Sequence, residues 1–334
     1  MSFLPPNVVR FCAFSLALLG CAIHSAGYGE VRHEGVHVLA NEILTVEVMD
    51  PDAEGVYYQG IRFASVANIL RVVRDGHDFL YSPVDHNPFK HNAGLAMEFD
   101  MAYREGAYGP PGYDDAAVGE AFLKIGVGSL RRASEDPYRF FNKYEVVEKA
   151  DTQATWSPSA VQFRQVSPLV NGYAYSLTSD ITLVANRIVV SHRLSNMGTR
   201  PFTTRNYAHN FIQFDDITSQ VGYQVRFPFD AVARIPKPAI IQSGRQLNVV
   251  SEITPKMKAA DAFFEMIPEP VEGPLELTHE ESHLAMEIRT SPAPSAFILH
   301  VSPRYICPEQ FLFFDLNPGQ SVNWSRTYTF SVEL

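Results

Sequence analysis

The sequence predicts an all-β protein, built as one large antiparallel β-sandwich. Segments in which apolar and polar side chains alternate recur almost to the C-terminal end, as half-buried strands require. The 23 prolines and 20 glycines favour many turns and few long helices. No internal repeat, low-complexity tract or linker divides the chain, so a single large domain is favoured over two.

Composition and charge exclude several classes of protein. Hydrophobic residues make up 46% of the chain and charged residues 19%, which are globular values and rule out wholesale disorder. The 27 Lys and Arg residues stand against 37 Asp and Glu residues, for a net charge of −10. That sign is wrong for binding a phosphate backbone, so no nucleic-acid partner is expected.

The N-terminal residues 1–29 are expected to be an export leader, which leaves residues 30–334 as the folded domain. Arg10 precedes an apolar stretch over residues 11–23 that is too short to span a bilayer stably. The Leu-Leu-Gly-Cys sequence that ends at Cys21 is similar to a lipobox, which would place a lipid anchor on Cys21. Cleavage at the small residues just beyond it is the alternative. In a bacterium the protein would then be periplasmic or membrane-anchored.

Strands are expected in order along the rest of the chain. Residues 43–48 and 188–194 carry the clearest alternation of apolar and polar side chains. Residues 102–119, rich in Gly, Pro, Tyr and Asp, are expected to form a long loop, and residues 253–262 one short helix. The further expected strands cover residues 160–165, 174–183, 295–301, 311–316 and 325–332.

Several standard catalytic motifs are absent from the sequence. The Gly126-Val127-Gly128 segment lacks a third glycine and a following helix pattern, which excludes a dinucleotide loop. No GxSxG, HExxH or CxxC occurs, and the spacing of His86 and His91 matches no strong metal motif, so neither a cofactor nor a metal is expected. Outside the leader Cys307 is the one cysteine, and a buried apolar role for it is favoured over a nucleophilic one.

His209 and Glu309 are the candidate catalytic residues. His209 lies in a polar and aromatic segment, residues 205–211, that follows a strand hairpin. Glu309 directly precedes an apolar run that reads as a buried strand. A buried glutamate must be paired or functional, because an isolated charge in a low dielectric is costly. Taken singly, each residue is more readily structural than catalytic.

The order of these segments resembles the galactose mutarotase-like (aldose 1-epimerase) superfamily over most of the chain after the leader. Residues 206–211 resemble the segment of that family that carries a catalytic histidine. Glu309, followed by a Pro-Gly turn and a closing aromatic strand, resembles the region of its catalytic glutamate. Residues 60–63 and 76–79 look like its opening hairpin, with Arg62 facing the cleft, and residues 94–99 and 119–128 look like a divergent branch. The family's usual first histidine has no clear match, although His86 and His91 are candidates.

The resemblance implies a large β-sandwich enzyme that interconverts sugar anomers by opening and closing the ring. Glu309 would act as the base and His209 as the acid, from opposite sides of the ring. Arg62 would bind sugar hydroxyls or a substrate carboxylate. The other candidate substrate contacts are His86, His91, Glu98, Tyr113, Lys124, Arg205, Tyr207 and Arg304.

Two other functions stay open at this point. The first is a lyase or glycosidase-related enzyme acting on uronate sugars, in which an Arg with a Tyr or His would promote β-elimination. The second is a non-catalytic carbohydrate-binding domain, for which the missing first histidine is the best argument. All three functions share a mono- or oligosaccharide as the partner.

Overall fold

A computed structural model describes residues 35–53, 58, 60–83, 89, 93–99 and 109–333. The expected leader, His86 and His91 lie outside these residues, as does the first part of the expected loop over residues 102–119. The described part of that loop, residues 109–119, consists of turns, as predicted. No described segment is a helix long and apolar enough to cross a membrane.

One sheet of nine strands carries the candidate site. Its order is β1-β2-β3-β5-β13-β21-β20-β17, and β4 pairs with β3 at one side. Every pairing between its strands is antiparallel. The strands are β1 (Val36–Ala40), β2 (Leu44–Met49), β3 (Ile69–Arg74), β4 (His77–Asp78), β5 (Leu95–Phe99), β13 (Phe202–Asn210), β17 (Ala260–Phe264), β20 (Ala296–Val301) and β21 (Ile306–Leu316).

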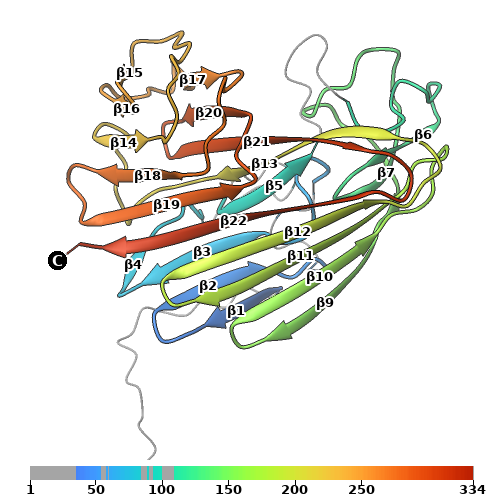
Figure 1. Cartoon of the computed structure of the whole chain (residues 1–334), viewed down its shortest axis with the longest axis horizontal. Helices are drawn as coiled ribbons and strands as arrows, with labels where there is room; N and C mark the ends of the chain where they lie inside the picture. Colours follow the sequence, from blue (N-terminus) through green and yellow to red (C-terminus); the bar gives the residue numbers. More distant parts are fainter. Residues whose placement is uncertain are drawn as a thin grey trace, which may run out of the picture. The chain divides into compact units, whose positions relative to one another are not determined.

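A second sheet has ten strands in the order β15-β16-β14-β18-β19-β22-β12-β11-β10-β9. The neighbouring strands β22, β12, β11, β10 and β9 run side by side in the lower half of Figure 1. The ten strands are β9 (Asp151–Ser157), β10 (Ala160–Val166), β11 (Tyr175–Val184), β12 (Arg187–Asn196), β14 (Tyr223–Arg226), β15 (Ile240–Ser243), β16 (Gln246–Val249), β18 (Pro274–His279), β19 (Leu284–Ser291) and β22 (Ser321–Val332). A small third sheet holds β6 (Ala121–Lys124), β7 (Gly128–Arg131) and β8 (Val146–Lys149).

The predicted all-β sandwich is confirmed, and the expected strands coincide with β2, β10, β11, β12, β20, β21 and β22. One of them, β21, begins at Ile306, five residues before the predicted start, because Pro308 and Glu309 interrupt the apolar pattern there. The short helix predicted over residues 253–262 is wrong. Residues 255–257 form a turn, and Lys258 follows with a φ of 66°, which a right-handed helix does not allow.

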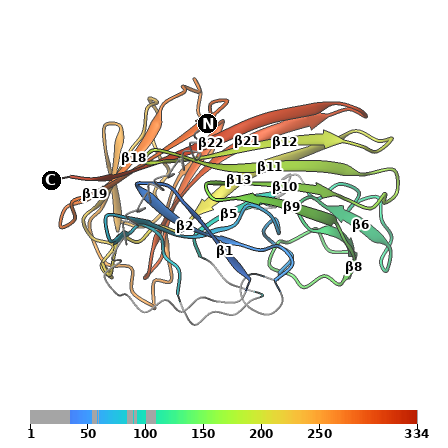
Figure 2. The same ribbon diagram turned by 90° about the horizontal axis from the view of Figure 1, so that it is seen from below.

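Aromatic side chains fill the space between the two large sheets. Phe79, next to β4, meets Phe330 of β22 with 5.1 Å between ring centroids. Trp324 of β22 lies 4.9 Å from Phe314 of β21 and 6.2 Å from Phe99 of β5, also between centroids. In Figure 2 the blue strands β1 and β2 lie below the green strands β10 and β11 of the other sheet. Because the apolar side chains point into this core, the opposite face of the nine-stranded sheet is left for polar groups.

Replacing Phe330 by Ala tests the role of this core. The side chain is fully buried between the sheets, so the change should lower the free energy of unfolding by about 3–5 kcal/mol. Phe141→Ala is the matched control, because Phe141 is 65% exposed and its loss should cost about 0.5 kcal/mol or less. Denaturant unfolding of both variants measures the difference. Equal costs would show that Phe330 is not a core residue.

Candidate active site

The two candidate catalytic residues come from neighbouring strands of the nine-stranded sheet. His209 lies on β13, and Glu309 lies on the adjacent antiparallel strand β21. Asn206 pairs with Leu312 in this sheet, and Ile212 forms a bridge with Ile306 in the same register. This register places His209 across from Glu309. Cys307 precedes Glu309 by two residues and therefore points to the same face.

On its other side β13 pairs with β5. Tyr207 lies opposite Glu98 in this pairing, which brings Glu98 to the face that carries His209. Arg62 lies in the segment before Phe63, which forms an isolated bridge with Glu98. The sheet thus brings together six residues from four separate segments of the chain.

Glu98 is the centre of this cluster. Its side chain is 0% exposed, and Oε2 accepts hydrogen bonds from Arg62 Nε at 2.7 Å, the Tyr207 hydroxyl at 2.5 Å and His209 Nε2 at 2.8 Å. Burial alone would raise the pKa of this carboxyl, but the charges of Arg62 and His209 lower it to about 2. The other oxygen, Oε1, is buried without a hydrogen-bond partner in the described part of the chain. Glu98 is therefore an ionised, fully enclosed anchor.

His209 is held between two carboxylates. Its Nδ1 lies 2.6 Å from Glu309 Oε1, and its Nε2 lies 2.8 Å from Glu98 Oε2. Burial lowers the pKa of the imidazole, but the charge of Glu309 and the hydrogen bonds that the ring donates to both carboxylates outweigh it and raise the pKa overall. The imidazolium form can donate one hydrogen bond to each carboxylate. In that form His209 holds a proton between the two carboxylates at the centre of the cluster.

Arg62 is the most exposed member of the cluster, with 24% of its side chain accessible. Its guanidinium lies 4.3 Å from the ring centroid of Phe140 and 5.0 Å from that of Phe63, which fixes it between two aromatic rings. The backbone N–H groups of Arg62 and Phe63 donate to the hydroxyl of Tyr58 at 2.5 and 3.1 Å. The segment before β3 is thereby fixed, and it presents the guanidinium at the edge of the cluster.

One carboxylate oxygen of Glu309 accepts hydrogen bonds from described residues, and the other does not. Oε1 accepts hydrogen bonds from His209 and from the Cys307 thiol, the latter at 3.4 Å. Oε2 forms no hydrogen bond with any described residue and is not sealed from solvent. Burial, and then the charge of Glu309, raise the pKa of the Cys307 thiol well above its ordinary value. Cys307 is a buried thiol rather than a thiolate nucleophile, as the sequence indicates.

The structure departs from the predicted geometry of the two catalytic candidates. An acid and a base on opposite sides of a sugar ring would have the ring between Glu309 and His209, whereas the two side chains touch each other. Side chains directly across an antiparallel pair have Cβ atoms about 4.5–5.5 Å apart, which leaves no room for a ring between their polar ends. A sugar ring therefore does not fit between the two side chains as they lie in this structure.

Three of the predicted substrate contacts are enclosed, and the first is Glu98, which is 0% exposed and binds Arg62 and His209 instead of a sugar. Tyr207 is 0% exposed, with its ring stacked on Phe311 at 4.4 Å between centroids. Lys124 is also 0% exposed, and its ammonium donates to the backbone carbonyl of Phe99 at the end of β5. The structure thus gives Tyr207 and Lys124 a positioning role in place of the expected sugar contact, because neither can reach solvent.

The remaining predicted contacts lie outside the cluster. Arg205 shares a face of β13 with His209, and its guanidinium lies 5.9 Å from the ring centroid of Phe313. Arg304 is exposed and donates to the hydroxyl of Tyr81 at 3.1 Å. Neither residue contacts His209 or Glu309 in the described structure.

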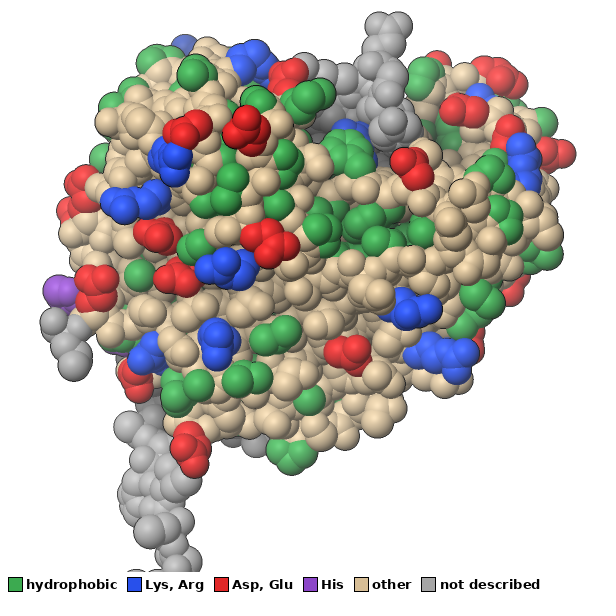
Figure 3. All heavy atoms as spheres, viewed as in Figure 1, with side chains coloured by type: hydrophobic (Ala, Val, Ile, Leu, Met, Phe, Trp, Pro, Cys, Tyr) green, Lys and Arg blue, Asp and Glu red, His purple; other side chains and the backbone are tan. Residues whose placement is uncertain are grey.

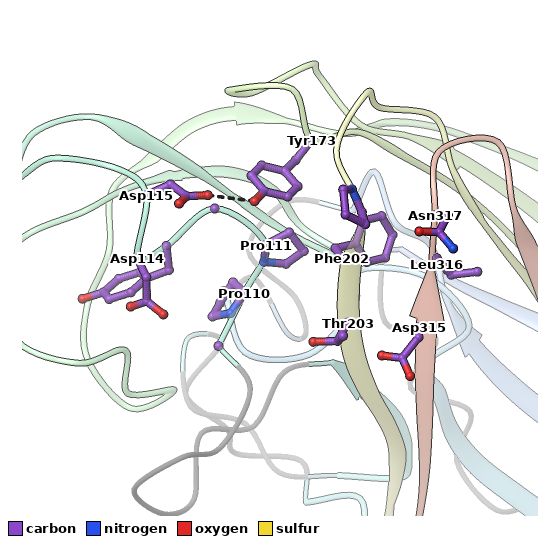
Figure 4. Close-up of a pocket in the computed structure, with 14 residues that line it drawn as sticks. Pro110, Pro111, Asp114, Asp115, Tyr173, Phe202, Thr203, Asp315, Leu316 and Asn317 are labelled. Carbon is purple, nitrogen blue, oxygen red and sulfur yellow. Dashed lines mark hydrogen bonds between the residues drawn. The ribbon is translucent and has the colours of Figure 1, made fainter.

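Tyr113 lies at a different cavity, of about 490 Å³, which also holds Asp115 and Tyr173. Figure 4 shows its walls, with Pro110 and Pro111 on one side and Phe202 and Asp315 on the other. The hydroxyl of Tyr173 donates to Asp115 at 2.7 Å, the bond drawn in Figure 4. Tyr113 itself is buried, and its hydroxyl donates to the carbonyl of Asp136 at 2.7 Å, so the ring supports this cavity rather than the catalytic candidates.

Solved structures of other proteins share the fold of this chain, although sequence comparison finds no match. No protein-family model matches the chain, and no curated protein sequence does. Solved structures do match. A galactose mutarotase related enzyme from Lactobacillus acidophilus aligns with a TM-score of 0.56 at 12% identity over 90% of this chain and 100% of its own. A galactose mutarotase-like protein from Lactobacillus casei gives 0.56 at 13% over 89% and 100%.

An aldose epimerase homologue from C. elegans gives a TM-score of 0.53 at 13% identity, over 90% of this chain and 99% of its own. This chain has the galactose mutarotase-like fold. At such low identity the likeness concerns the fold alone. Within that galactose mutarotase-like fold, sequence reasoning missed Tyr58 and Phe140, which position Arg62. Tyr58 lies only four residues before Arg62 and Phe140 comes from a distant loop, and irregular segments such as these leave no periodic signal in the sequence.

The buried Glu98 makes stability depend on pH in a defined direction. Its pKa in the folded protein is about 2, below the ordinary 4.5, so its contribution is complete above pH 4.5 and is lost as the pH falls toward 2. The loss should be on the order of 3 kcal/mol. Glu98→Gln should remove this part of the pH dependence and should lower stability at pH 7 by about 3–5 kcal/mol.

Glu145→Gln is the matched control, since Glu145 is an exposed partner of Arg131 and its loss should cost less than about 1 kcal/mol. Denaturant unfolding at a series of pH values gives both quantities. The same acid dependence in wild type and Glu98→Gln would show that Glu98 is not the anchor.

Proposed function

We propose that the protein is an aldose 1-epimerase-like isomerase that interconverts the anomers of a mono- or oligosaccharide. One observation carries the proposal: a carboxylate oxygen free to accept a proton, Glu309 Oε2, is joined through Oε1 to an imidazole that stores one, His209. The likeness of the fold to structures described as a galactose mutarotase related enzyme and a galactose mutarotase-like protein supports the same reaction class.

Anomer exchange needs one proton removed and one supplied. The anomeric hydroxyl loses its proton while the ring oxygen gains one, which opens the sugar ring to an aldehyde. The aldehyde group then rotates, and the ring closes on its other face. Glu309 Oε2 takes the hydroxyl proton, and His209 gives the ring oxygen the proton on Nδ1. That proton is bonded to Glu309 Oε1 before the sugar arrives, so the ring oxygen must replace Oε1 as its acceptor. Glu98 occupies Nε2, which leaves Nδ1 as the nitrogen that can donate.

Arg62 supplies the binding contact next to His209. Its guanidinium is partly exposed, is held by Glu98 and lies 3.2 Å from His209 Nε2 through Nη2. In this position it can donate to a sugar hydroxyl or to the oxygen on which charge develops. The face shown in Figure 3 is hollowed near its middle, and hydrophobic side chains gather there over the region where β5, β13 and β21 lie in Figure 1.

The lyase alternative finds less support. An elimination led by a tyrosine needs a phenolate that reaches the substrate. Tyr207, the tyrosine in the cluster, is 0% exposed and donates its hydroxyl to Glu98. Burial, and then the charge of Glu98, raise its pKa well above the ordinary value, so it stays a phenol.

A non-catalytic sugar-binding domain is the second candidate, and one observation favours it. Glu309 and His209 satisfy each other in a buried ion pair, which a purely structural pair would also do. The two functions differ in what happens to a bound sugar, since an isomerase exchanges its anomers and a binding domain does not.

Export is part of the proposal and rests on the sequence of residues 1–29, with Cys21 as a lipid anchor in one version. Mass analysis of membrane and soluble fractions should find a mature chain that begins between residues 21 and 31. Exported protein that retains Met1 would contradict this part of the proposal.

Two substitutions test the isomerase directly. Proton NMR of freshly dissolved aldoses and uronate oligomers identifies a sugar whose anomers exchange faster with the protein than in buffer. Glu309→Gln should then lower kcat about 10²–10⁴-fold with little change in affinity, because the amide still hydrogen-bonds but takes no proton. His209→Asn should behave similarly, and the double variant should be little worse than either single one.

The matched control is Glu276→Gln on β18, an exposed glutamate that should leave turnover unchanged. Wild-type turnover in Glu309→Gln would overturn the assignment of the base. A sugar that binds without anomer exchange would favour the binding domain instead.

A further inference from the structure

Three side chains of metal-binding type meet at one point, and two of them are the proposed proton-transfer pair. Cys307 Sγ lies 3.4 Å from Glu309 Oε1 and 3.8 Å from His209 Nδ1. The third distance, from His209 Nδ1 to Glu309 Oε1, is 2.6 Å. All three groups are buried, and their ligand atoms lie within 4.8 Å of one another.

These distances are close to those of a tetrahedral metal site. Zinc binds sulfur at about 2.3 Å, and imidazole nitrogen or carboxylate oxygen at about 2.0–2.2 Å. Tetrahedral angles then place the sulfur about 3.5 Å from the nitrogen and from the oxygen, and the nitrogen about 3.3 Å from the oxygen. The two distances to sulfur, 3.4 and 3.8 Å, are close to this value. The Nδ1 to Oε1 distance must widen, as it would when an ion takes the place of the shared proton.

We infer that Cys307, His209 and Glu309 form a binding site for a thiophilic divalent cation, with Zn²⁺ as the best match. A thiol, an imidazole and a carboxylate are three protein ligands from the set that zinc uses, which leaves a fourth position for water or another small ligand. Sulfur favours zinc, cobalt or cadmium over magnesium or calcium, which prefer oxygen. The two ligands on β21 are two residues apart on one face, so the strand itself sets their spacing.

The surroundings of His209 are those of a metal ligand. A histidine that binds a metal almost always donates its other ring N–H to a carboxylate, a carbonyl or water, which fixes the ring and its tautomer. Here Nε2 lies 2.8 Å from Glu98 Oε2, on the side of the ring away from Cys307 and Glu309. With the proton held on Nε2, the lone pair of Nδ1 faces the site. Glu98 is thus a positioning residue for the ligand set.

The charge of the cluster allows the exchange of protons for an ion. Without a metal, Arg62 and a protonated His209 balance the charges of Glu98 and Glu309. A divalent ion displaces one proton from His209 Nδ1 and one from Cys307 Sγ, and both protons pass to solvent. The ion brings two positive charges and the two protons remove two, so the net charge of the cluster is unchanged. No uncompensated charge is buried in this exchange.

Cation binding does not depend on the proposed isomerase activity, and it is tested by metal uptake without any assay of turnover. If both hold, the ion occupies the base and the acid of the proposed reaction and blocks turnover. If the isomerase assignment fails, the ligand geometry is unaffected. The experiment below therefore reads out binding alone.

Cobalt is the probe, because a bound thiolate gives Co²⁺ a charge-transfer band in the near ultraviolet. The full chain, reduced and freed of metal with a chelator, should take up one equivalent of Co²⁺ with this band. One equivalent of Zn²⁺ should abolish it, and excess Mg²⁺ should not. Cys307→Ser should bind Co²⁺ without the band while keeping its thermal unfolding transition.

Two further variants serve as the control and the positioning test. The chain also contains Cys12 and Cys21, so the double change C12S and C21S should keep the band. Glu98→Gln should keep the band but weaken Co²⁺ affinity about 10–100-fold. A wild-type chain with no band, or a band that persists in Cys307→Ser, overturns the inference.

Discussion

A carboxylate enclosed by protein determines the arrangement of the candidate site. Glu98 is 0% exposed, and an ionised carboxyl in such a place is stable only when hydrogen bonds and opposite charges compensate its lost hydration. Arg62, Tyr207 and His209 each donate a hydrogen bond to its Oε2, and these bonds restrict the conformations of the three side chains. Glu309 then meets the remaining nitrogen of His209. The proposed base, acid and binding residue are therefore positioned through one group that does not itself reach solvent.

The core between the sheets keeps Glu98 where it is. Its neighbours on β5, Met97 and Phe99, point into the apolar core, so Glu98 must point to the opposite face. A slip of one residue in the pairing of β5 would turn Glu98 into the core and Met97 out of it, at a large cost in free energy. Apolar packing on one face of the sheet thus fixes the positions of the polar side chains on the other face. The same argument applies to β21, where Leu312 and Phe314 face the core and Glu309 and Cys307 do not.

The sequence predicts the strands better than the site. Alternation marks β2, β10, β11, β12, β20 and β22, because each has one face in the core. Pro308 hides the start of β21, and the apolar residues around Glu98 give no sign of its three donors. Residue types and chain order single out His209, Glu309 and Arg62, which the fold brings together. The direct contact between His209 and Glu309 depends on the register of β13 and β21. This register is a property of the folded sheet and cannot be predicted from the sequence of either strand alone.

The central claim is that His209 is an imidazolium held between two carboxylates. Nitrogen NMR of the metal-free protein at pH 7, labelled with ¹⁵N at histidine, tests it most directly. The account predicts one imidazole with protons on both ring nitrogens, and His209→Asn should remove that signal. A His209 ring with one unprotonated nitrogen at pH 7 would contradict the account, because one of the two carboxylates would then lack its donor.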